Sequence, residues 1–247
     1  MQAATQPTRG AWHENGTIFK TICQEAVVSK TKQSGFTLIE IAIVLVIIGL
    51  LLGGVLKGQE LINSAKVKNL ATDFRNIPLY FYGYQDRFKA LPGDDARVVT
   101  NLNGATVAST NGTVGNGVIE GAWNSATLTD ESTLFWQHVR LAGLAAGPTS
   151  TGDANYMPRN SDGGRIGVQS NVGFTTITTP TPTMSGSYII CSDGILGSYV
   201  KQLDTTLDDR ETSTGSLRAI TSGATNGAAV TSANIVDANS YTVCLSV

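Results

Sequence analysis

The chain has 247 residues, room for one or two domains, and its 17 basic and 19 acidic side chains give a formal net charge of −2. This charge is too small to indicate nucleic acid or an acidic surface as a partner. The sequence also contains no nucleophile elbow, acid/base pair or strong metal-ligand constellation, so we do not expect an enzyme.

The first predicted element is an apolar run, Phe36–Leu56, in which Glu40 is the only ionisable side chain. Its length matches the roughly 20 residues that a helix needs to cross a hydrocarbon core of about 30 Å. Lys30 and Lys32 precede the run, which places its N-terminal side in the cytoplasm and the following residues outside the inner membrane. A secretory signal peptide is the ordinary alternative. Its apolar core is shorter, about 7–15 residues, and ends at a small-residue cleavage site that does not follow here.

The segment Gly35-Phe36-Thr37-Leu38-Ile39-Glu40, with the apolar run behind it, resembles the N-terminal signal of the type IV pilin and pseudopilin superfamily. In that superfamily a prepilin peptidase cleaves after the glycine and methylates the new N-terminal phenylalanine. The resemblance therefore implies cleavage between Gly35 and Phe36, N-methylation of Phe36, and a role for Glu40 in filament assembly. It covers residues 30 to about 90 well and the rest of the chain in outline.

Glu40 needs a partner if it is ionised, because an unpaired carboxylate in hydrocarbon costs several kcal/mol. No lysine or arginine of the run can pair with it. The resemblance implies that its partner is the α-amino group of Phe36 on a neighbouring subunit. The alternative is a protonated glutamate without a role in assembly.

The resemblance assigns residues 1–35 to a leader peptide, which we exclude from the fold. This leader is long for the superfamily, and no methionine lies between Met1 and Met157. We expect translation to begin at Val28, because valine codons serve as bacterial starts, and residues 1–27 to be a gene-model extension. A peptide containing Trp12 in the unprocessed precursor would contradict this start.

The helix is predicted to continue over residues 57–90 as an amphipathic segment. Its apolar stripe has spacings of three and four residues and comprises Phe74, Ile77, Phe81, Tyr84 and Phe88. We expect this face to anchor the globular part. Within residues 36–56 and just after them, four glycines each weaken the helix by about 1 kcal/mol relative to alanine: Gly49, Gly53, Gly54 and Gly58. They indicate either local unwinding on assembly or close helix packing, and the two are compatible.

Leu91-Pro92-Gly93-Asp94 ends the helix, and residues 91–127 have a composition typical of turns. They correspond in position to the variable loop of pilins. A second helix is predicted at about 130–145, with Thr129 as its N-cap. His138 on this helix is the only histidine after the leader, and without nearby ligands or a nucleophile we interpret it as a structural side chain.

Part of the loop is reminiscent of an EF-type calcium site. Asn116 and Glu120 fall on two ligand positions of such a loop, but Gly112 and Val114 occupy two others that require oxygen ligands. Calcium at this loop is therefore a weak candidate beside a plain glycine turn.

Residues 165–247 carry the β signal. Four short β-branched or alternating runs predict strands: Arg165–Gln169, Val172–Ile177, Ser187–Cys191 and Tyr241–Leu245. A sheet packed on the aromatic face of the long helix buries both surfaces. The predicted fold is thus α+β and pilin-like, with a long N-terminal helix, a short second helix and an antiparallel sheet in a globular head of residues 91–247.

The number and positions of the cysteines indicate whether the chain contains a disulfide. Cys23 lies in the leader, which leaves Cys191 and Cys244, each in a predicted strand. Two cysteines outside the membrane favour a disulfide, with two free buried thiols as the alternative. The resemblance implies the same bond, because a C-terminal disulfide ties the last strand to the sheet in pilins.

Leu196–Asp209 predicts a further short helix. Asp204 and Asp208 are four residues apart, so on a helix they share one face and repel each other. A metal ion or a basic residue of a neighbouring subunit would relieve this repulsion. The alternative is a solvated surface, and Arg210 offers a local counter-charge where related sequences often have glycine. These aspartates are weak metal candidates, and no other cofactor is expected.

The resemblance implies a filament subunit, either a major or minor pilin of a type IV pilus or a pseudopilin of a type II secretion system. A membrane-anchored binding protein with no filament role is the second alternative. The large, threonine- and asparagine-rich head favours the pilus. Expected partners are other pilin subunits, the prepilin peptidase/N-methyltransferase, the inner membrane and the assembly machinery. We expect the precursor in the inner membrane with its head in the periplasm, and then a surface pilus or a periplasmic pseudopilus.

Overall fold

The computed structural model describes residues 35–180 and 183–247. These residues fall into two units, one ending at Leu50 and one running from Leu51 to Val247, and each is described by itself. The expected leader up to residue 34, including the expected start at Val28, lies outside the described residues.

Helix α1 (Leu38–Phe88) is continuous through Pro78. From residue 67 onward one face of this helix is buried in the second unit. The members of the predicted stripe Phe74, Ile77, Phe81 and Tyr84 are at most 3% exposed, whereas Phe88 is half-buried. The spacing of three and four residues that predicted this stripe is therefore the spacing of the buried face.

The segment after α1 contains a short helix, α2 (Val98–Asn101), which the prediction of a loop over 91–127 lacked. Asp95, only 1% exposed, holds this segment to the end of α1. Its carboxylate accepts hydrogen bonds from the Tyr84 hydroxyl (3.0 Å), the Arg97 amide (2.8 Å) and the Asn101 side chain (2.7 Å). Burial and the adjacent carboxylate of Asp95 together raise the pKa of Tyr84.

Helix α3 (Glu131–Leu141) is shorter than the predicted range of 130–145, and soon after its end Gly143 has φ +75°. Its N-cap residue is Asp130, so the expectation that Thr129 caps this helix is wrong. The Asp130 carboxylate makes no capping hydrogen bond and instead accepts bonds of 2.5–2.9 Å from side chains of the preceding loop: Thr110, Asn111 and Ser125.

Four strands form one antiparallel sheet in the order β1-β2-β4-β3. The bounds are β1 (Ile166–Ser170), β2 (Tyr188–Leu196), β3 (Leu217–Thr221) and β4 (Ser240–Ser246), with α4 (Gly197–Leu207) after β2 and a 3₁₀ turn, η1 (Ser232–Asn234), before β4. β1, β2 and β4 overlap three predicted strands.

The other strand assignments were wrong in two places. β3 was missed, because Leu217–Thr221 is short and carries Arg218 within it. Val172–Ile177 is not a strand: Gly173 has φ +80°, and the Phe174 amide donates to the Asn171 carbonyl (3.0 Å) in a turn. A glycine in a left-handed conformation interrupts the extended backbone that the β-branched composition suggested.

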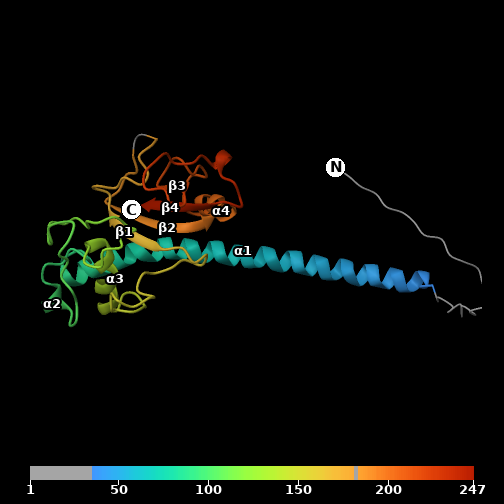
Figure 1. The fold of residues 1–247 in the computed structure, drawn as a ribbon, viewed down its shortest axis with the longest axis horizontal. Helices are drawn as coiled ribbons and strands as arrows, with labels where there is room; N and C mark the ends of the chain where they lie inside the picture. The colour runs from blue at the N-terminus through green and yellow to red at the C-terminus, as the bar shows by residue number, and fades with distance from the viewer. Residues whose placement is uncertain (1–34, 181–182) are drawn as a thin grey trace, which may run out of the picture. The chain divides into compact units, whose positions relative to one another are not determined.

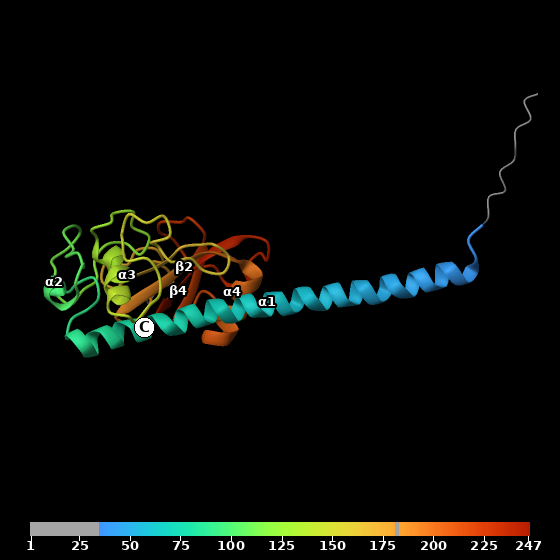
Figure 2. The same cartoon turned by 90° about the horizontal axis from the view of Figure 1, so that it is seen from below.

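The sheet packs on the second half of α1, with α3 and α4 near opposite ends of the sheet (Figures 1 and 2). The Phe81 ring stacks on Tyr188 of β2 at 4.5 Å between ring centroids and meets Phe135 of α3 at 4.8 Å. The Tyr199 hydroxyl of α4 donates to the Asn63 side chain of α1 (2.9 Å). The arrangement is α+β, as predicted, with its core between the helix and the sheet.

Candidate functional site

The N-terminal motif forms the beginning of α1. Gly35, Phe36 and Thr37 precede the helix, which begins at Leu38. The Glu40 carboxylate accepts hydrogen bonds from the Thr37 amide and the Thr37 hydroxyl, each at 2.8 Å, and the Glu40 amide donates back to the Thr37 hydroxyl at 3.3 Å. Thr37 and Glu40 therefore form a capping box, which satisfies amides that the first turn of a helix leaves without partners.

This capping box gives Glu40 a partner within its own chain. Thr37 is a partner that the prediction of a charged neighbour for Glu40 did not include. The signal was present in the sequence, because a threonine followed three residues later by a glutamate, ahead of an apolar run, is the pattern of a capping box. The carboxylate keeps acceptor capacity beyond these two bonds, so an additional partner remains compatible with this geometry.

The helix behind the motif presents an apolar surface. It contains an 18-residue stretch with a mean hydropathy of 2.8, none of which is buried, so it has the length and composition to cross a membrane. Phe36 is 83% exposed. Apart from the adjacent backbone of α1 itself, a Cβ added to any of four glycines would meet no atom within 4 Å: Gly49, Gly53, Gly54 and Gly58. Both interpretations of these glycines, unwinding and close packing, therefore stay predictions.

Cys191 and Cys244 form a disulfide that joins β2 to β4. The two residues lie directly opposite each other in the antiparallel register, and both are fully buried. Trp123, Ile189 and Ile220 pack in the same small apolar cluster. The bond thus fastens β4, which lies between β2 and β3 in the sheet, to β2.

The loop that was reminiscent of a calcium site is organised around Asp94. The Asp94 carboxylate accepts hydrogen bonds from three consecutive backbone amides, those of Gly115, Asn116 and Gly117. Gly115 and Gly117 have φ +87° and +84°, a conformation that glycine adopts readily. Burial raises the pKa of Asp94, and these amide bonds offset part of the rise.

The two candidate ligands of that loop bind backbone amides. The Asn116 side chain accepts a hydrogen bond from the Val118 amide, and the Glu120 carboxylate accepts one from the Thr113 amide, both at 2.8 Å. These contacts form a glycine turn held by a carboxylate, and calcium at this loop stays a prediction.

His138 links α3 to two loops. Its Nδ1 accepts a hydrogen bond from the Gly93 amide (2.9 Å), so its Nε2 carries the proton and donates to the Thr106 carbonyl (2.9 Å). The side chain is fully buried, and burial lowers its pKa. A neutral, doubly hydrogen-bonded imidazole accounts for this residue structurally.

The structure brings Asp204 and Asp208 together with a third carboxylate, Asp209. One carboxylate oxygen from each lies within 4.8 Å of the others. Asp204 is on α4 and Asp208 is its C-cap residue, whose amide donates to the Asp204 carbonyl at 2.8 Å. Asp204 is 0% exposed, which also excludes the solvated-surface interpretation for this residue. Among the described residues Arg210 forms no ion pair with these carboxylates, and the charge of Arg218 acts on Asp209.

Residues 30–56 match the protein family described as the prokaryotic N-terminal methylation motif. The match includes Gly35, Phe36 and Glu40 and ends where the apolar run ends. Comparison with the curated proteins and with the solved structures finds no match. The chain therefore carries a prepilin-type N-terminal signal of the kind found in type IV pilins and pseudopilins, joined to an α+β, pilin-like arrangement.

Proposed function

We propose that this chain is a structural subunit, major or minor, of a type IV pilus. The observation that carries the proposal is the methylation motif at residues 30–56, at the start of a helix whose apolar surface is exposed. An exposed apolar helix of this length is stable in a membrane before assembly and among other such helices after it. The motif implies processing by a prepilin peptidase and assembly into a filament.

The proposed assembly contact joins Glu40 of one subunit to the α-amino group that cleavage after Gly35 creates on Phe36 of its neighbour. In a low-dielectric filament core, pairing the carboxylate with the ammonium group offsets the desolvation of both charges. Because both groups lie at one end of the helix, their pairing would set the axial step between neighbouring subunits.

A pseudopilin of a type II secretion system has the same N-terminal signal and is the alternative. The choice of the pilus rests on the head, which is large and rich in threonine and asparagine, as suits a surface exposed to the outside of the cell. The buried disulfide between β2 and β4 is consistent with such an oxidising location.

The proposal is tested by shearing surface filaments from a wild-type strain and from a strain lacking this chain. We expect the wild-type filaments to contain the chain beginning at N-methylated Phe36, identified by mass spectrometry, and expect the deletion to reduce or alter the filaments while exoprotein secretion stays normal. Intact filaments with a loss of secretion would instead assign the chain to the secretion system.

A further inference from the structure

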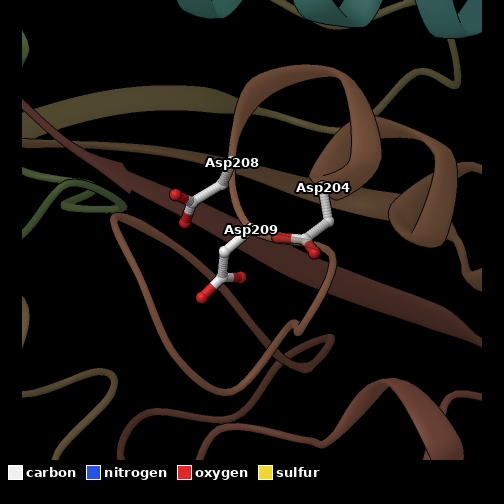
Figure 3. Close-up of side chains that lie close together, drawn as sticks. All are labelled: Asp204, Asp208 and Asp209. Atoms are coloured by element: carbon white, nitrogen blue, oxygen red, sulfur yellow. The ribbon is translucent and has the colours of Figure 1, made fainter.

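We propose that Asp204, Asp208 and Asp209 form a calcium-binding site in the second unit of the chain. The site is independent of the N-terminal signal and of the proposed role in a filament. Figure 3 shows the three side chains gathered around the turn that follows α4, with one Asp204 oxygen directed toward Asp209.

The strongest observation is the state of Asp204. Its side chain is 0% exposed, and among the described residues neither of its carboxylate oxygens accepts a hydrogen bond of ordinary geometry. Buried polar groups in folded proteins are nearly always paired, and a buried carboxylate without a partner points to a ligand that completes its coordination.

The neighbouring carboxylates of Asp208 and Asp209 favour a cation beside Asp204. One carboxylate oxygen of each of Asp204, Asp208 and Asp209 lies within 4.8 Å of the others, so three negative charges meet beside the Arg210 amide. A bound dication would neutralise the repulsion between the three carboxylates.

Asp208 and Asp209 are held in place by contacts that leave acceptor capacity. The Leu217 amide donates to Asp208 Oδ2 (2.7 Å), and no hydrogen bond among the described residues occupies Asp208 Oδ1. The Glu211 amide donates to Asp209 Oδ1 (3.0 Å) and the Thr214 hydroxyl to Asp209 Oδ2 (2.8 Å). Each oxygen so bonded still has a second lone pair for a cation. The carboxylates are thus oriented before any ligand arrives.

The donor set favours calcium. Three carboxylates provide only hard oxygen ligands, which excludes a preference for softer metals such as zinc or copper. Calcium accepts several protein carboxylates in a flexible geometry, whereas magnesium usually keeps several waters and binds one or two carboxylates, so three carboxylates within 4.8 Å of one another favour calcium. Water would complete the coordination on the side of Asp209, which is exposed.

The test measures calcium binding to the full chain, purified in detergent and stripped with EDTA, at pH 7.5. Isothermal titration is expected to show saturable binding to the wild type. At a free calcium concentration about one hundred times the dissociation constant, the midpoint of thermal unfolding should rise by about 5–10 °C. Asp204→Asn should abolish the binding and the rise, and Asp209→Asn should weaken binding at least tenfold.

Asp86→Asn is the matched control, since it removes one carboxylate of α1 that is 90% exposed and should bind calcium as the wild type does. The variant at exposed Asp209 keeps the test informative even if Asp204→Asn does not fold. The proposal is overturned if the wild type shows no saturable binding, which is the result expected of an Asp204 that is merely protonated. It is equally overturned if both cluster variants bind as tightly as the control.

Discussion

The hydroxyl and amide of Thr37 both donate to the Glu40 carboxylate at 2.8 Å and close the first turn of α1. Glu40 thus has a local role as the acidic half of a capping box and a proposed role as the partner of Phe36 on a neighbouring subunit. The two roles require different neighbours, so substitutions can separate them.

We expect Glu40→Ala to leave cleavage after Gly35 largely intact and to block filament assembly. Thr37→Val removes the hydroxyl of the capping box but keeps the carboxylate, so it should be cleaved and should still assemble. Immunoblotting of processed and unprocessed chain measures cleavage, and electron microscopy of sheared material measures assembly. Normal filaments from Glu40→Ala would exclude the intersubunit pair, and equal loss in both variants would attribute the defect to the helix cap.

The disulfide is expected to stabilise the second unit by about 4 kcal/mol in the chain-entropy treatment of its 53-residue separation. The double variant Cys191→Ala/Cys244→Ala removes the bond without burying a polar group, and denaturant unfolding measures the loss. Alkylation of unfolded, unreduced protein should label neither cysteine, and labelling of both would exclude the bond. Reduction before alkylation provides the positive control.

Glu131 predicts a pH dependence of stability. It is fully buried, its Oε2 accepts a hydrogen bond from the Glu120 amide (2.9 Å), and its Oε1 has no hydrogen-bond partner among the described residues. Burial, followed by the charges of Asp94, Glu120 and Asp130, raises its pKa from 4.5 to about 7, while the Glu120 amide acts in the opposite direction. The folded state therefore binds this proton more tightly than the unfolded state does.

Because the pKa of Glu131 is raised, its contribution to stability is fully present below about pH 4.5 and is lost as the pH rises through about 7. We expect Glu131→Gln, which resembles the protonated acid, to remove up to about 3 kcal/mol of this loss and to be more stable than the wild type at pH 8. Chemical unfolding of both proteins between pH 4 and 8 measures the difference. Parallel pH profiles would show that Glu131 is not the group responsible.

His138 should contribute to stability through its two hydrogen bonds. His138→Phe fills similar space but leaves the Gly93 amide and the Thr106 carbonyl without their buried partner, at an expected cost of about 2–4 kcal/mol. His138→Gln can accept from one and donate to the other and should lose less. Urea unfolding compares the two variants, and a similar small loss in both would show that these bonds contribute little.

The sequence by itself determined the N-terminal half of α1. A membrane-length apolar run, a glycine before phenylalanine and a glutamate five residues beyond the cleavage point are local patterns, and residues 30–56 match the methylation motif as contiguous sequence. The aromatic stripe of α1 could also be predicted from the sequence, because helical periodicity depends only on spacing along the chain. The pairing of Cys191 with Cys244 was expected from their number and compartment.

Only the tertiary structure decided features that join distant segments. β3 has little strand signal of its own and exists because Leu217–Thr221 pairs with β4 along its whole length. The Asp130 carboxylate binds the Thr110 hydroxyl of the preceding loop and makes no capping hydrogen bond to α3. Asp204 is buried, although its sequence neighbours suggest a solvated helix face. In each case long-range contacts outweigh local propensities, since burial and pairing energies exceed differences of a few tenths of a kcal/mol per residue.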